Sequence, residues 1–147
     1  MRARSLTDAR DGATTFVVVL DVGEEALSTL SAFAKKQGLA ASHFVGLGAF
    51  SDVVVGFFDW QRKDYERIVI REQVEVLSLV GDITLADGTP RVHAHVVVGK
   101  RDGTAHGGHL IEGHVRPTLE ITLVETPAHL RRVHDPATGI ALIDPGR

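Results

Sequence analysis

The chain has 147 residues, the usual size of one domain, which leaves no room for a catalytic domain beside a separate regulatory one. Its 44% hydrophobic and 24% charged residues indicate a folded globular protein and exclude an intrinsically disordered one. The formal net charge of −3 gives no overall attraction to nucleic acid or anionic membranes, and the absence of cysteine excludes disulfides, thiolate zinc sites and cysteine nucleophiles.

The expected organisation is one domain over residues 14–143, between a polar N-terminal segment, residues 1–13, and a short tail, residues 144–147. The N-terminal segment carries mixed charge and lacks the apolar stretch that a secretory signal or a membrane span needs. We therefore expect a cytoplasmic protein that has no membrane partner.

The first predicted elements are a strand and a helix. Thr14–Asp21 is a β-branched apolar run, which predicts a central strand. Glu24–Gln37 has apolar residues at helical spacing, acidic residues in its first turn and lysines in its last, and Gly38 follows as a C-terminal cap. No other segment has so clear a helical pattern.

Strand-like segments then follow at short, turn-rich intervals, which imply antiparallel neighbours. They cover His43–Phe50, Asp52–Trp60, Tyr65–Ile70, Val74–Leu85, Arg91–Gly99, His106–Leu110 and Thr118–Glu125. We expect a short helical turn at Leu130–Arg132 and an edge strand at Gly139–Ile143. The predicted fold class is therefore α+β: a single domain with a largely antiparallel sheet of about six to eight strands and one main helix.

The single predicted helix can bury only one of the two faces of this sheet. A helix of about 14 residues is about 21 Å long and covers only one face. The segments Val53–Phe58 and Val74–Gly81 are too uniformly apolar for a strand with a solvated face. Either loops or another subunit must cover the second face, and the second case predicts an oligomer.

Three histidines form the main candidate site. His93 and His95 alternate along one predicted strand, so their side chains share a face, with Cα atoms about 6.6 to 6.8 Å apart. A hairpin turn between Asp102 and Gly103 brings His109 within one residue of His95. We expect a bulge in the two glycines before His109 to align the two histidines.

These three imidazoles predict a site for zinc or another divalent metal, with a fourth position open for water or a small ligand. The alternative is that His93 and His95 are two hydrogen-bonded histidines without a metal. His106 is expected to face elsewhere, and the role of His114 stays open. Glu120 is expected as a fourth ligand, as a partner that orients a histidine, or as a solvent-facing residue.

The order of motifs along the chain resembles the PPC domain, the plant- and prokaryote-conserved domain that follows an AT-hook in plant nuclear proteins. The resemblance covers roughly residues 15–142, and the H-x-H motif followed by G-G-H-L is its most specific part. The motifs that carry it are Val45–Asp52, Gly56–Asp59, Glu75–Gly81, Asp87–His95 and Gly107–Leu110.

The resemblance implies an antiparallel α+β fold, a homotrimeric assembly and, as in some prokaryotic members, a histidine metal site at His93, His95 and His109. The plant members are DNA-binding proteins in which the AT-hook contacts the minor groove. This chain has no Arg-Gly-Arg-Pro core, and its Arg2, Arg4 and Arg10 are not separated by the Gly and Pro of an AT-hook.

Three functions follow as hypotheses. The first is a trimeric module that binds a divalent metal, with a small-molecule ligand at the metal. The second is a DNA-binding or transcription-associated protein, although we expect no DNA binding by the isolated chain; its candidate contacts are the basic pairs Lys35–Lys36, Lys100–Arg101 and Arg131–Arg132. The third is a zinc-dependent enzyme, for which no catalytic residue is predicted.

Overall fold

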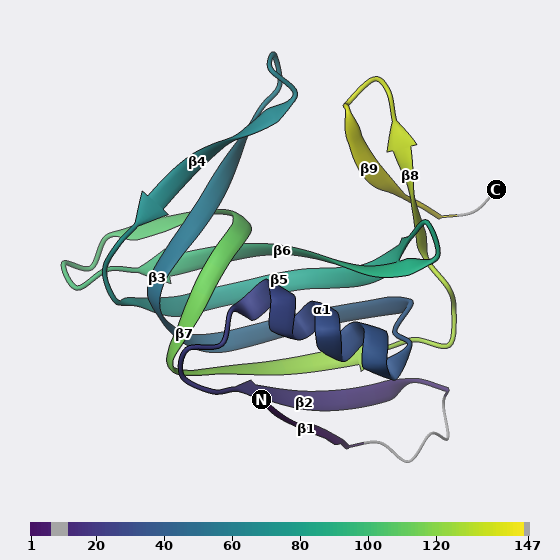
Figure 1. Ribbon diagram of the computed structural model, residues 1–147, viewed down its shortest axis with the longest axis horizontal. Coiled ribbons are helices and arrows are strands. Elements are labelled where there is room, and N and C mark those ends of the chain that lie inside the picture. The colour runs from purple at the N-terminus through teal and green to yellow at the C-terminus, as the bar shows by residue number, and fades with distance from the viewer. Residues whose placement is uncertain (7–11, 146–147) are drawn as a thin grey trace.

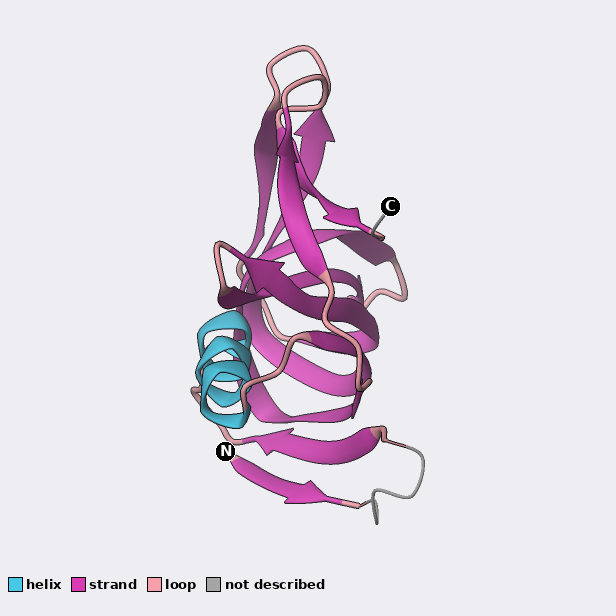
Figure 2. Ribbon diagram, turned by 90° about the vertical axis from the view of Figure 1, so that its right-hand side faces the viewer, coloured by secondary structure: helices cyan, strands magenta, loops and turns pink. Residues whose placement is uncertain are grey.

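The computed structural model describes residues 1–6 and 12–145. One helix packs beside a strongly curved sheet in the described part of the chain (Figures 1 and 2). In chain order the elements are β1 (Arg2–Ser5), β2 (Thr14–Leu20), α1 (Ala26–Gln37), β3 (Ala41–Asp59), β4 (Asp64–Ile70), β5 (Val74–Ala86), β6 (Thr89–Gly99), β7 (Ala105–Glu125), β8 (Arg131–Asp135) and β9 (Ile140–Asp144).

The predicted α+β class with one main helix is confirmed, and the described residues form a sheet of nine strands where about six to eight were predicted. All strand pairs are antiparallel except the single pair Leu85 and Arg131, which joins β5 to β8 in parallel. Two pairs of predicted strands are each one long strand, β3 and β7, because no turn interrupts them. Their register instead shifts at local irregularities, which bend the strands without ending them.

At the two ends of the chain the structure adds one strand to the prediction and corrects one element. The first strand of the predicted domain, β2, is flanked on both sides, by β7 and by β1. Residues 2–5 of the expected polar N-terminal segment form β1, and their side chains are exposed. The expected helical turn at Leu130–Arg132 is instead the start of β8, which pairs with β9 along its length. Arg10 lies outside the described residues.

Helix α1 begins and ends where its capping groups predict. The Glu25 side chain accepts hydrogen bonds from the backbone N–H groups of Leu27 and Ser28, so Glu25 is the N-cap and the helix begins two residues later than expected. Gly38 adopts the left-handed conformation, φ 67° and ψ 33°, as the predicted C-terminal cap. The helix buries Ala26, Leu30, Phe33 and Ala34 against the sheet. Within the described residues, no helix is long and apolar enough to cross a membrane.

Four strands form a closed circuit of backbone pairing. Strand β3 pairs with both β5 and β7, and β6 also pairs with both of them. All four strands contribute to one buried apolar cluster, which α1 completes; its largest fully buried side chains include Phe44, Phe50, Leu79, Leu110 and Leu119. The circuit leaves little freedom in register, because a slip in one pair must be matched by the other three.

A second face of the sheet remains exposed and apolar, as the sequence predicts. Val45, Leu47, Leu77 and Val80 are 55%, 63%, 53% and 47% exposed, and we call these four residues the apolar sheet patch. They line a hollow of about 470 Å³ on β3, β5 and β7. These side chains stay in contact with solvent in the described residues of a single chain.

Substituting Gly81 by Ala is expected to destabilise the fold. Gly81 lies in β5 opposite Ala94, and an added Cβ would overlap the Phe44 ring and the backbone oxygen of His93. We expect a loss of about 1–3 kcal/mol in the free energy of unfolding, measured by urea denaturation. The control is Gly99→Ala in β6, whose Cβ would meet only the exposed Leu77 side chain, at 3.1 Å. Equal stability of the two variants would contradict this account of the packing.

Candidate metal centre

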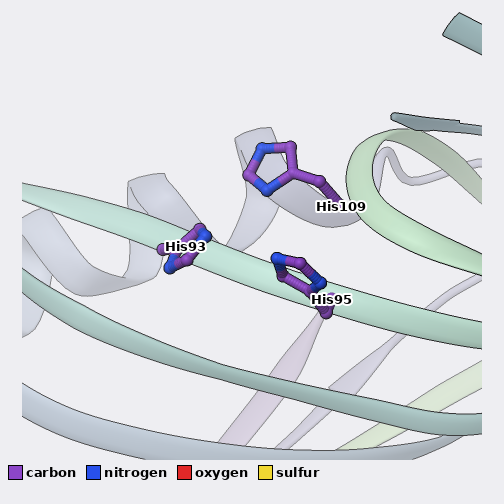
Figure 3. A group of neighbouring side chains, drawn as sticks. All are labelled: His93, His95 and His109. Atoms are coloured by element: carbon purple, nitrogen blue, oxygen red, sulfur yellow. The ribbon is translucent and has the colours of Figure 1, made fainter. Parts of the chain in front are cut away.

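Strand β6 places His93 and His95 on one face, with Ala94 buried on the other. The His109 ring from β7 completes the group, and Figure 3 shows the three rings turned toward one another. The ring centroids of His93 and His95 are 5.3 Å apart. The ring centroid of His109 lies 5.1 Å from that of His93 and 5.4 Å from that of His95. One ring nitrogen from each lies within 4.8 Å of the other two, so the sequence-predicted group is assembled.

The register that brings His109 to His95 differs from the predicted one. His95 pairs directly with His109, and no bulge lies between β6 and β7. The connecting loop has an odd number of residues, 100–104, and closes through a hydrogen bond from the Lys100 N–H to the Thr104 carbonyl at 2.9 Å. The turn is therefore centred on Asp102 and not after it, which removes the one-residue offset that the sequence analysis needed a bulge to correct.

His109 is the most buried of the three and is held as a neutral imidazole. Its ring stacks on Tyr65 at 4.5 Å between centroids, and its buried Nδ1 has no hydrogen-bond partner among the described residues. Burial, followed by the nearby His93 and His95, lowers the pKa of His109 to about 4. Burial and the neighbouring His93 also lower the pKa of His95. At neutral pH both imidazoles are therefore unprotonated at one ring nitrogen, whose lone pair is free to bind a metal.

His93 is tied to an ion pair beneath the site. Its Nδ1 lies 3.4 Å from Asp82 Oδ2 and 3.1 Å from an Arg132 guanidinium nitrogen. That nitrogen is 2.8 and 2.9 Å from the two Asp82 oxygens. Burial alone would raise the pKa of Asp82, but the hydrogen bonds and charges of His93 and Arg132 lower it. Asp82 and Arg132 thus both contact the Nδ1 side of the His93 ring and fix its orientation, while Nε2 makes neither of these contacts.

The Arg132 side chain is only 11% exposed and links the C-terminal hairpin to the site. Besides Asp82, it donates from Nε to Thr84 Oγ1 at 3.0 Å and from a terminal nitrogen to the Ala141 carbonyl at 2.9 Å. Its charge is thus neutralised by Asp82, and its planar donors are shared among three acceptors. This network fixes the position of Asp82 and, through it, the orientation of His93.

The donor set fits a divalent metal. Three neutral imidazoles without a thiolate suit zinc and its first-row neighbours, and three protein ligands leave a fourth position open. The unpartnered Nδ1 of His109 is the strongest sign, because a buried polar atom without a partner costs free energy that a ligand would recover.

The other residues singled out from the sequence lie elsewhere. His106 is exposed and 3.5 Å from Thr104 Oγ1. His114 is paired with Asp52 at 2.8 Å, which raises the pKa of His114. Glu120 is exposed and lines the hollow of the apolar sheet patch, so among the described residues it does not join the three-histidine group.

Sequence reasoning missed Asp82, Tyr65 and Arg132. A signal for Asp82 was present: the two-residue turn Asp87–Gly88 sets a register in which Asp82 pairs directly with His93. No comparable local signal exists for Arg132, which reaches the site from a hairpin at the far end of the chain, nor for Tyr65 on β4.

Comparison with known proteins gives relatives of matching size and fold. A plant- and prokaryote-conserved (PPC) protein of Pyrococcus horikoshii is 34% identical, with a TM-score of 0.84 over 90% of this chain and 92% of that one. A metal-containing protein of Archaeoglobus fulgidus is 32% identical, with a TM-score of 0.81 over 87% and 91%. A putative DNA-binding protein of Ralstonia eutropha is 28% identical, with a TM-score of 0.83 over 95% and 100%.

The chain is also 33% identical over 120 residues to the bifunctional protein GlmU of a Synechococcus strain. That match takes in 80% of this chain but only 18% of the longer protein. The sequence profile of the Plants and Prokaryotes Conserved (PCC) domain matches residues 7–127, most of the chain. The chain therefore belongs to the Plants and Prokaryotes Conserved (PCC) domain family, the family that its motifs resemble.

Proposed function

We propose that this chain is a trimeric PCC-domain module that binds one divalent metal, zinc, through His93, His95 and His109, with an open position for water or a small ligand. The observation that carries the proposal is the convergence of three imidazoles around a buried His109 nitrogen that has no partner in the described residues. The likeness to the metal-containing Archaeoglobus protein supports it.

The roles of the protein residues follow from their surroundings. Burial keeps His95 and His109 neutral, which is the form that ligates. Asp82 and Arg132 contact His93 Nδ1 and orient its ring, while Tyr65 holds the His109 ring by stacking. When bound, zinc would supply Lewis-acid chemistry at its open position, which makes a zinc-dependent enzyme the second alternative.

The trimer is proposed because of the apolar sheet patch. Four large apolar side chains, each about half exposed, gather on one face, where a subunit interface would remove them from water. The family resemblance implies three subunits, whereas the patch itself implies only an oligomer.

DNA binding is the first alternative, and the likeness to the Ralstonia protein favours it. The charges of this chain argue against it. Lys100 lies 2.6 Å from Glu72, and Arg132 is bound to Asp82, so two of the three basic pairs each have a neutralised member. A chain of net charge −3 also gives a trimer of about −9, which would repel a duplex at long range.

The purified protein is expected to hold about one zinc per chain after loading and removal of free metal, measured by elemental analysis. His109→Ala should lose this metal, because only two imidazoles remain. The control His106→Ala, on the same strand but outside the group, should keep it. Stoichiometric zinc in His109→Ala, or its loss from His106→Ala, would refute the assigned ligands.

The metal-free protein should show an unusual His109 titration. In the unfolded chain the imidazole has a pKa of 6.5, and in the folded chain about 4. The unfolded chain therefore binds the proton first, and this group makes the free energy of unfolding fall as the pH decreases from about 6.5 toward 4. NMR of the ring protons should give a His109 midpoint near pH 4 when folded. A folded midpoint at or above 6.5 would contradict the burial argument.

Light scattering at micromolar concentration is expected to give a mass of about 48 kDa, three times the 15.9 kDa chain. Leu47→Asp should shift the mass toward a single chain, because it places a charge in the apolar sheet patch. Val133→Asp is the matched control, since Val133 is also about half exposed but lies on β8, away from the patch. A wild-type mass of about 16 kDa would contradict the assembly.

A further inference from the structure

Two hairpins rise from the rest of the sheet (Figure 1). One is formed by β3 and β4, and the other by β8 and β9. They are joined near their tips by a hydrogen bond of 2.7 Å from Lys63 Nζ to the Ala137 carbonyl. A cavity of about 540 Å³ lies between β4, the turn joining β5 and β6, and the β8–β9 hairpin. We call it the hairpin cavity.

The hairpin cavity borders the candidate metal centre through one of its three histidines, His93. Arg132, which binds Asp82 beside His93, and Tyr65, which stacks on His109, also line the cavity. Val92, Ile140 and Leu142 form an apolar wall. The volume is within the range of small-molecule sites, which are mostly apolar with a few polar groups at one end.

We propose that the hairpin cavity binds a small monocarboxylate with an apolar body, whose carboxylate occupies the open position of the metal. This inference rests on the proposed metal site. It goes further in naming the chemical class of the ligand and the part of the chain that selects it.

The charge of the site selects an anion. Three neutral imidazoles leave the full +2 charge of a divalent metal uncompensated. The nearest carboxylate, Asp82, is already committed to Arg132 and His93. Arg91 also lines the cavity and has no ion-pair partner among the described residues, and Asp87 is the one carboxylate in the same lining. A carboxylate oxygen is an established zinc ligand type and balances half of the metal charge.

The wall of the cavity selects an apolar body. Leu142 is 42% exposed, although it faces a hollow that an apolar chain could fill. Burying each methylene of such a chain is worth about 0.8 kcal/mol, or about a fourfold gain in affinity when burial is complete. Affinity should therefore rise with chain length until the cavity is full.

The test uses the full-length protein loaded with Co²⁺, whose visible absorption reports changes in metal coordination. Titration with acetate, butyrate and hexanoate should change the spectrum, and affinity should rise about two- to fourfold for each added methylene. Leu142→Ala should weaken hexanoate binding about fivefold or more and leave acetate binding unchanged. Val133→Ala, on the same hairpin but outside the cavity lining, is the control and should bind both as the wild type does.

The outcomes separate this inference from the metal site itself. If Co²⁺ gives no spectrum of a protein-bound ion, the proposed metal site is refuted and the inference with it. If Co²⁺ binds but the carboxylates leave the spectrum unchanged, the metal site stands and the inference fails. The inference also fails if affinity does not depend on chain length, if the Leu142→Ala and Val133→Ala variants behave alike, or if hexylamine or inorganic phosphate binds as tightly as hexanoate.

Discussion

The pairing of β6 with two strands at once is the constraint on which the site depends. Its pairing with β7 sets His95 opposite His109, and its pairing with β5 sets Asp82 opposite His93. Because β3 closes the circuit between β5 and β7, neither register can slip alone. A one-residue slip would turn the histidines to the buried face of β6, where the core has no room for them. The same pairing that builds the core thus also brings the three histidines together.

The electrostatics of the site divide between two layers. The layer that faces the metal position is neutral, since burial disfavours the charged forms of His95 and His109. The layer beneath is ionic, with Asp82 held by Arg132 from the last hairpin. The histidines are neutral, and Asp82 and Arg132 neutralise each other, so neither layer would compensate the charge of a bound metal. That charge would therefore attract an anion. The apolar wall of the hairpin cavity then gives a physical basis for choosing among anions.

Much of this could be predicted from the sequence because it is local. Alternation along one strand placed His93 and His95 together, and the short loop after Gly99 brought His109 near them. Gly38 likewise marked the end of the helix, whereas its start, capped by Glu25, lies two residues later than the sequence predicts. The features that the sequence did not predict depend on long-range packing. One of them is β1, whose polar residues pair along an edge of the sheet. Arg132 lies in a strand rather than in a helical turn, and its guanidinium binds Asp82, fifty residues away in sequence.

The most direct test of the account is a crystal structure of the zinc-loaded protein with anomalous diffraction measured on both sides of the zinc absorption edge. The account predicts one anomalous peak per chain, about 2.0–2.1 Å from one ring nitrogen each of His93, His95 and His109. A zinc peak away from these histidines, or one that His109 does not contact, would contradict it.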